Sequence, residues 1–142
     1  WQGFKVKVGF GASADRAAVE SLRRLVGDAA IMVDANQAWT PDQAIAAGQA
    51  LADFELLWLE EPIAADRPGD DWTQVALGQP VPLAAGENMT GFDEFNTAVT
   101  AFSRQRYRPC CDCPRRHRPW CQLARSRCHR EPVANSVFRR GI

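Results

Sequence analysis

Residues 56–62 read LLWLEEP, an apolar run that turns acidic and is then stopped by a proline. A run of this kind predicts a strand that is buried on both faces, as the strands of a parallel sheet are. Pro62 has no backbone N–H to donate to a sheet, so it marks the end of the strand. The stretch therefore sets Glu60 and Glu61 at the carboxyl end of an inner strand.

The first hundred residues alternate between such strands and helical patterns. Further strands are expected at FKVKVG (4–9), AAIMVDAN (29–36) and VPLAAGEN (81–88). Helices are expected over residues 13–27 and 40–54, over about 70–77, and from residue 90 onward. Strands that alternate with helices in this way are typical of a parallel sheet with crossover helices.

Capping residues predict where the helices begin. Thr40 and Gln43 have the spacing of a capping box, and Thr90 and Asp93 have the same spacing. Ser13 is the expected N-cap of the first helix. The apolar stripe of that helix is expected to consist of Ala18, Leu22, Leu25 and Val26.

A charged residue stands at the carboxyl end of each predicted strand. These residues are Lys7, Asp34, Glu60 and Glu87, which follow one another at steps of 27, 26 and 27 residues. One strand, one helix and two short loops fill about that length. Since the carboxyl ends of the strands converge on one site in a closed β/α barrel, the repeat predicts an α/β fold, a partial TIM-type barrel of about four βα units.

Three of these charged residues, Asp34, Glu60 and Glu87, are carboxylates from neighbouring strand ends. Three oxygen ligands with no Cys or His nearby suit a hard cation, and Mg²⁺ is the usual one. The plainer interpretation is that these acids pair with buried lysines or cap helices. Their common position in the repeat favours the metal site.

Lys5 and Lys7 lie on one face of the first strand, because side chains alternate along a strand. Exposed lysines can simply deter pairing at a sheet edge. The alternative is catalytic: beside a metal that stabilises the charge formed on a carboxylate substrate, a neutral lysine can remove the α-proton. Desolvation and a second ammonium nearby both lower the pKa of a lysine. We therefore expect Lys7 to be the base and Lys5 its charged neighbour.

Four short motifs occur in order over residues 3–95: KVK after Gly-Phe, DANQAW, LEEP and AGEN. Their order and spacing resemble the barrel domain of the enolase superfamily, most closely its mandelate racemase and muconate lactonizing enzyme group. The resemblance implies that Lys7 is the acid/base and that Asn36 faces the substrate. It also implies the metal ligands Asp34, Glu60 and Glu87. Glu61, which follows a ligand, is expected to point elsewhere.

The resemblance implies magnesium-dependent removal of the proton α to a carboxylate. The expected outcome is dehydration of a sugar acid, with racemisation or cycloisomerisation as the alternatives. Family members also carry a capping domain before the barrel and three further strands after it, and neither is readable here. Residues 1–102 are therefore expected to hold only the second to fifth barrel strands, in a truncated and inactive fragment of a homo-oligomeric parent.

The composition changes near residue 103. Residues 1–102 carry six basic and fifteen acidic residues, a net charge of −9, whereas residues 103–142 carry eleven arginines, no lysine and two acids, a net charge of +9. No run approaches the length of a membrane span, about 18 apolar residues, and no signal peptide is visible. We expect a cytoplasmic protein that binds neither membranes nor nucleic acid.

Three interpretations of the basic tail, residues 103–142, stay open. Its cysteines and histidines could bind zinc, although their spacing fits no usual pattern; they are Cys110, Cys111, Cys113, His117, Cys121, Cys128 and His129. Its arginines could contact a polyanion. The third interpretation, which we favour, is that the tail is an irregular or disordered segment read in a shifted frame. An arginine-, proline- and cysteine-rich segment without lysine is what a GC-rich gene yields in a wrong frame.

Overall fold

The computed structural model describes residues 3–105, all of which belong to the first of two units in the chain, Trp1–Tyr107. The predictions for the tail beyond residue 105, including its cysteines and histidines, lie outside the described residues. Within residues 3–105, no helix has both the length and the apolar character needed to cross a membrane.

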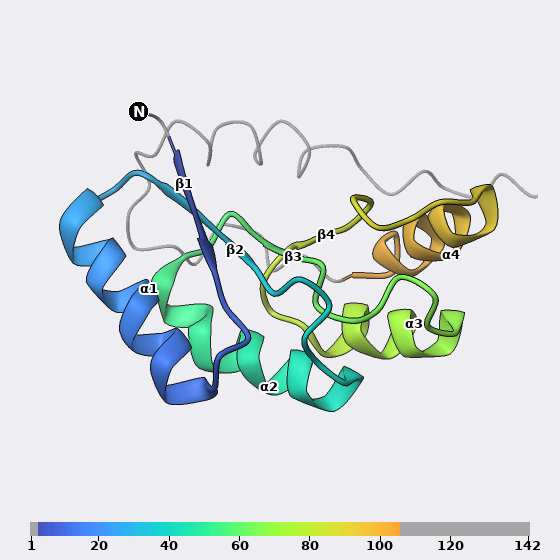
Figure 1. The fold of residues 1–142 in the computed structure, drawn as a ribbon, viewed down its shortest axis with the longest axis horizontal. Helices are drawn as coiled ribbons and strands as arrows, with labels where there is room; N and C mark the ends of the chain where they lie inside the picture. The colour runs from blue at the N-terminus through green and yellow to red at the C-terminus, as the bar shows by residue number, and fades with distance from the viewer. Residues whose placement is uncertain (1–2, 106–142) are drawn as a thin grey trace, which may run out of the picture. The chain divides into compact units, whose positions relative to one another are not determined.

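Four parallel strands form one sheet in the order β1-β2-β3-β4 (Figure 1). The strands are β1 (Gly3–Lys7), β2 (Ala30–Asp34), β3 (Trp58–Glu60) and β4 (Leu83–Ala84). The helices are α1 (Ala12–Val26), α2 (Pro41–Leu51), α3 (Gly69–Gly78) and α4 (Phe92–Phe102), with a short 3-10 turn, η1 (Ala52–Phe54), after α2. A helix follows every strand, which confirms the predicted α/β fold with four βα units of a partial barrel.

The register of the sheet aligns the charged strand ends. Lys7 pairs with Asp34 across β1 and β2, and Asp34 pairs with Glu60 across β2 and β3. Paired residues of parallel strands point to the same face, so these three side chains stand in one row. Glu60 pairs in turn with Ala84, the last residue of β4.

The helices cover the opposite face of the sheet, where α1, α2 and α3 lie along the strands in Figure 1. Alternate strand residues on this face, among them Ile31, Val33 and Leu59, are fully buried. They belong to a core cluster that includes Val19 of α1 and Leu51 of α2. A second cluster joins α2, α3 and α4 around Trp72, whose ring meets the edge of Phe102 at a centroid distance of 5.6 Å.

For the first helix, two predictions were wrong: which side chains face the core, and at which residue the helix begins. Val19 is fully buried, whereas Leu25 is 83% exposed and Ala18 is exposed as well. The inward face of α1 consists of Asp15, Val19, Leu22 and Val26. Periodicity alone did not distinguish this stripe from the neighbouring one, because both contain Leu22 and Val26. The helix begins after Gly11, so the expected N-cap, Ser13, lies inside it.

The capping box of α2 is confirmed: Thr40 Oγ1 accepts from the Gln43 N–H, and Gln43 Oε1 accepts from the Thr40 N–H. The expected pairing of Thr90 with Asp93 is wrong by one residue. Helix α4 begins after Gly91, and the Glu94 carboxylate accepts from the backbone N–H groups of Thr90 and Gly91.

The fourth strand is much shorter than the expected range 81–88. Pro82 donates no hydrogen bond, and Gly86 has a φ of 142°, which takes the chain out of the extended conformation. As a result, Glu87 lies in a turn three residues beyond the end of β4.

Candidate metal centre

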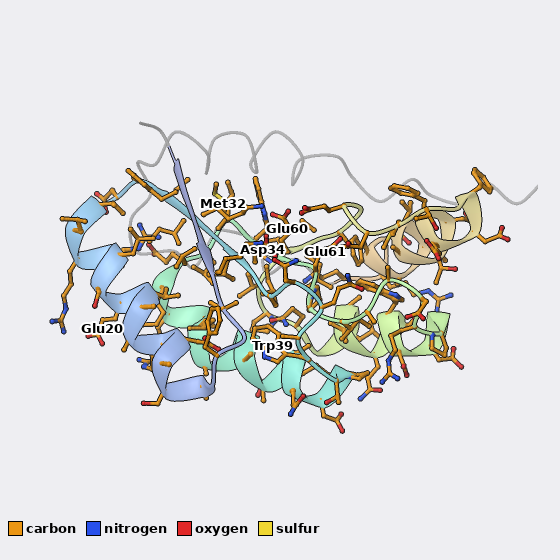
Figure 2. The ribbon with its side chains drawn as sticks, in the orientation of Figure 1. Glu20, Met32, Asp34, Trp39, Glu60 and Glu61 are labelled. Carbon is orange, nitrogen blue, oxygen red and sulfur yellow. The ribbon has the colours of Figure 1, made fainter. Side chains whose placement is uncertain are left out.

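Three carboxylates meet at the carboxyl edge of the sheet. Asp34 ends β2, Glu60 ends β3, and Glu87 follows β4. One carboxylate oxygen from each residue lies within 4.8 Å of the corresponding oxygens of the other two. Figure 2 labels Asp34 and Glu60 near the ends of their neighbouring strands. The structure thus brings the three predicted ligands together.

The donor set fits magnesium. An octahedral Mg²⁺ with bonds of about 2.1 Å holds its oxygen ligands roughly 3–4 Å apart, so oxygens within 4.8 Å reach it with small side-chain movements. Residues 3–105 contain neither Cys nor His, the ligands that a zinc site prefers. Asp34 is buried while Glu87 is exposed, so the cluster is anchored on one side and open to water or substrate on the other.

Both predicted lysines reach this cluster. Lys5 Nζ lies 3.0 Å from Glu60 Oε1 and 3.2 Å from Asp34 Oδ2. Lys7 Nζ lies 2.8 Å from Asp34 Oδ2. Two ammonium groups among three carboxylates leave an excess of one negative charge, which favours a bound cation.

The carboxylates beside Lys5 favour its charged form. The hydrogen bond to Glu60, followed by the hydrogen bond to Asp34, raises the pKa of Lys5 above its usual value. Lys5 therefore stays protonated at neutral pH, as expected of a charged neighbour of Lys7.

Two opposing effects act on the pKa of Asp34. Burial raises it, because the side chain is only 1% exposed. Hydrogen bonds from Lys7, from the backbone N–H of Asn36 and from Lys5 lower it, and their sum prevails, so the pKa lies below its usual value. The carboxylate is therefore ionised and available to a cation over the neutral range.

Asn36 also belongs to the cluster, as expected from its position two residues after Asp34, but a turn and not a continuing strand puts it there. Strand β2 ends at Asp34, and Asn36 has a φ of 46°, in the left-handed region. Its backbone N–H donates to Asp34 Oδ1 at 3.0 Å, and its side-chain Oδ1 accepts from Lys7 Nζ. A turn therefore brings Asn36 beside the predicted base.

Two further residues support the carboxylates: Trp58, which the sequence did not single out, and Glu61, whose direction was expected but whose role was not. Trp58 Nε1 donates to Glu60 Oε2 at 3.1 Å and so fixes the orientation of that carboxylate. Period-two alternation, which sets residues 58 and 60 on one face, was a usable signal for it. Glu61 is only 2% exposed, and its carboxylate points to the turn that carries Glu87. The sequence indicates only that Glu61 points away from the ligands.

Comparison with known proteins identifies the family to which the chain belongs. The model of the enolase C-terminal domain-like family matches residues 1–106. D-galactarolactone cycloisomerase of Agrobacterium fabrum is 38% identical over 88 residues, which are 61% of this chain and 23% of that protein. L-talarate/galactarate dehydratase of Salmonella typhimurium is 35% identical over 116 residues, which are 80% of this chain and 28% of that protein. The chain thus spans about a quarter of the length of these relatives.

Solved structures agree with the family match. A racemase from Streptomyces coelicolor A3(2), solved with bound magnesium, superposes with a TM-score of 0.68 at 37% identity, over 72% of this chain and 29% of that one. The family is one of enzymes, and it includes structures that hold magnesium. The chain therefore belongs to the enolase superfamily, in its mandelate racemase and muconate lactonizing enzyme group.

Proposed function

We propose that the chain carries the magnesium-binding part of a site that removes the proton α to a carboxylate. The observation that carries this proposal is the meeting of three carboxylates, Asp34, Glu60 and Glu87, with two lysines at one edge of the sheet. The substrate is a small carboxylate such as a sugar acid. Dehydration is the proposed outcome, with support from the dehydratase relative; the cycloisomerase and racemase relatives support the alternatives.

Each residue has a definite task in this proposal. Asp34, Glu60 and Glu87 would hold the ion, which, when bound, stabilises negative charge on the substrate carboxylate. Lys7 gives one proton to water and leaves Asp34, and the neutral amine at Nζ then takes the α-proton to become an ammonium again. Lys5 stays charged between Glu60 and Asp34 and offers its remaining donor capacity to the substrate carboxylate.

Asn36 assists the base directly. Its Oδ1 accepts from Lys7, which orients the amine, while its Nδ2 group, which donates to no other group within residues 3–105, can donate to a substrate oxygen. Asn36→Ala should therefore weaken both proton transfer and substrate binding in a catalytically complete protein.

We also propose that this chain turns over no sugar acid unaided. The described residues supply one side of a site, with a single base and no opposing acid, and β1 and β4 each pair on one side only within residues 3–105. The test is incubation with Mg²⁺ and a panel of sugar acids, with product analysis by NMR. Magnesium-dependent turnover that disappears in Lys7→Ala would contradict the proposed inactivity and support the proposed chemistry.

The metal-binding part of the proposal is tested by calorimetric titration with Mg²⁺. We expect one site in the unsubstituted chain and loss of measurable binding in Glu60→Gln, which has the same size without the charge. Glu20→Gln is the matched control, because Glu20 lies on α1 and pairs with Arg24, well away from the site in Figure 2. No heat of binding in the unsubstituted chain, or equal binding in Glu60→Gln, would refute the proposal.

A further inference from the structure

Glu61 is a buried carboxylate beside the metal centre that the proposed mechanism does not use. It is 2% exposed. Its Oε1 accepts from the backbone N–H groups of Gly86 at 3.3 Å and Asn88 at 3.1 Å, and its Oε2 accepts from Asn88 Nδ2. These donors flank Glu87 on both sides in the sequence. Glu61 therefore binds the turn that presents the third carboxylate.

The three carboxylates differ in the structure that fixes their positions. Asp34 and Glu60 end strands that pair with each other, so the sheet fixes their backbones. Glu87 lies three residues past the end of β4, outside the paired strands. Its position depends on the turn over residues 86–88, and the Glu61 carboxylate binds that turn through three hydrogen bonds.

The backbone of Glu61 indicates that its side chain has a purpose. Its φ of 47° lies in the left-handed region, which is unfavourable for a glutamate. The residue nevertheless stays tied to both neighbouring segments. Its N–H donates to Ala84 O at 2.9 Å, and its carbonyl accepts from the Gln37 N–H at 2.7 Å. Glycine would relieve the strain but would remove the carboxylate that holds the turn.

We propose that Glu61 is a positioning residue, which fixes the turn over residues 86–88 and thereby holds Glu87 with Asp34 and Glu60. The inference rests on the proposed function, since it concerns the third ligand of the magnesium site. Residues that orient metal ligands without binding the metal commonly change its affinity about 10–100-fold when they are replaced.

The test compares Glu61→Gln with the unsubstituted 142-residue chain by calorimetric titration with Mg²⁺. Glutamine has the size and shape of glutamate, but an NH₂ group replaces one carboxylate oxygen. That group cannot accept a hydrogen bond from the N–H donors of the turn. We expect magnesium affinity to fall roughly tenfold or more. The amide protons of Gly86 and Asn88 should also exchange faster in the metal-free variant, a readout that does not depend on metal.

Two further variants separate positioning from general stability. Asp15→Asn is the matched control, because Asp15 is also buried and accepts from two backbone N–H groups, those of Gly9 and Phe10, both at 3.0 Å. It should lower the melting temperature but leave magnesium affinity unchanged. Asn88→Ala removes one donor from an exposed residue, so it should fold normally and weaken magnesium binding less than Glu61→Gln does.

The possible results distinguish the inference from the proposal on which it rests. If the unsubstituted chain binds Mg²⁺ and Glu61→Gln binds it equally well, the inference is overturned and the metal site stands. If Glu61→Gln does not fold, unchanged magnesium affinity in Asn88→Ala overturns the inference. If the unsubstituted chain does not bind Mg²⁺, the proposed function fails and the inference fails with it.

Discussion

Lys7 and Asp34 are joined both by the sheet and by their side chains. They are register partners across β1 and β2, and Lys7 Nζ lies 2.8 Å from Asp34 Oδ2. The ammonium therefore occupies the same carboxylate that a metal ion needs. Cation binding and release of the lysine from Asp34 should be coupled, and this coupling can be measured.

Replacing Lys7 should strengthen metal binding. Lys7→Gln removes a positive charge that competes for Asp34, while Lys5 still contacts that carboxylate at 3.2 Å. We expect a severalfold rise in magnesium affinity at low salt that shrinks as salt is added, because Lys7 is half-exposed and its charge is screened. Calorimetry at two salt concentrations measures the change. Arg24→Gln, an exposed substitution on α1, serves as the control, and a weaker affinity in Lys7→Gln would contradict the coupling.

Magnesium should stabilise the folded chain. At a free concentration 100 times the Kd, binding to the folded state alone adds about 2.7 kcal/mol, which raises the Tm of a domain of this size by roughly 10–20 °C. Differential scanning calorimetry with Mg²⁺, and again after EDTA, measures the shift. Asp34→Asn should abolish it, whereas Asp53→Asn, at an exposed position on η1, should not. A magnesium shift that survives Asp34→Asn would place the ion elsewhere.

Gly48→Ala should be destabilising even though alanine favours helices. A Cβ at residue 48 would lie 1.6 Å from Gln79 Oε1, and Gln79 is a buried side chain that donates to Ala44 O at 2.9 Å. Overpacking of this kind costs about 1–3 kcal/mol, more than the gain in helix propensity of about 1 kcal/mol. Urea unfolding measures the loss.

The control for this substitution is Gly91→Ala. A Cβ there would meet nothing within 4 Å, and the φ of −126° suits any residue. Because Gly91 is the N-cap of α4, where alanine is a poorer cap than glycine, its free energy of unfolding should fall by less than about 1 kcal/mol, without the clash expected at residue 48. Equal stability of Gly48→Ala and Gly91→Ala would mean that Gln79 can move aside at no cost.

The two predicted N-caps should respond differently to alanine. Thr40→Ala breaks the capping box of α2 and should cost about 1 kcal/mol of stability. Ser13→Ala lies inside α1 and should be within about 0.5 kcal/mol of neutral. Urea unfolding of both variants checks the assignment, and a larger loss from Ser13→Ala would show that α1 begins where the sequence predicted.

The row of Lys7, Asp34 and Glu60 could be predicted because extended strands and regular repeats leave few alternatives. Glu87 was predicted at the right step in the repeat, but it was expected on a strand and lies in a turn. Its position depends on Gly86 and on the buried carboxylate of Glu61, which a repeat does not reveal.

Alternation says little where the chain leaves the extended conformation. Asn36 and Glu61 have positive φ, so it is turns, and not a continuing strand, that put Asn36 beside Lys7 and direct Glu61 away from the ligands. The inward face of α1 was missed for another reason: two apolar stripes share residues, and the sheet selects between them.

The register that sets the three charged side chains in one row is also more stable than a register shifted by one residue. A slip of β2 by one residue would turn Asp34 toward the helices, among fully buried neighbours such as Val19 and Leu59. An unpaired carboxylate there costs several kcal/mol, so a sheet misaligned by one residue is less stable than the native register. The acids assigned to chemistry thus also favour one register of the sheet over its neighbours.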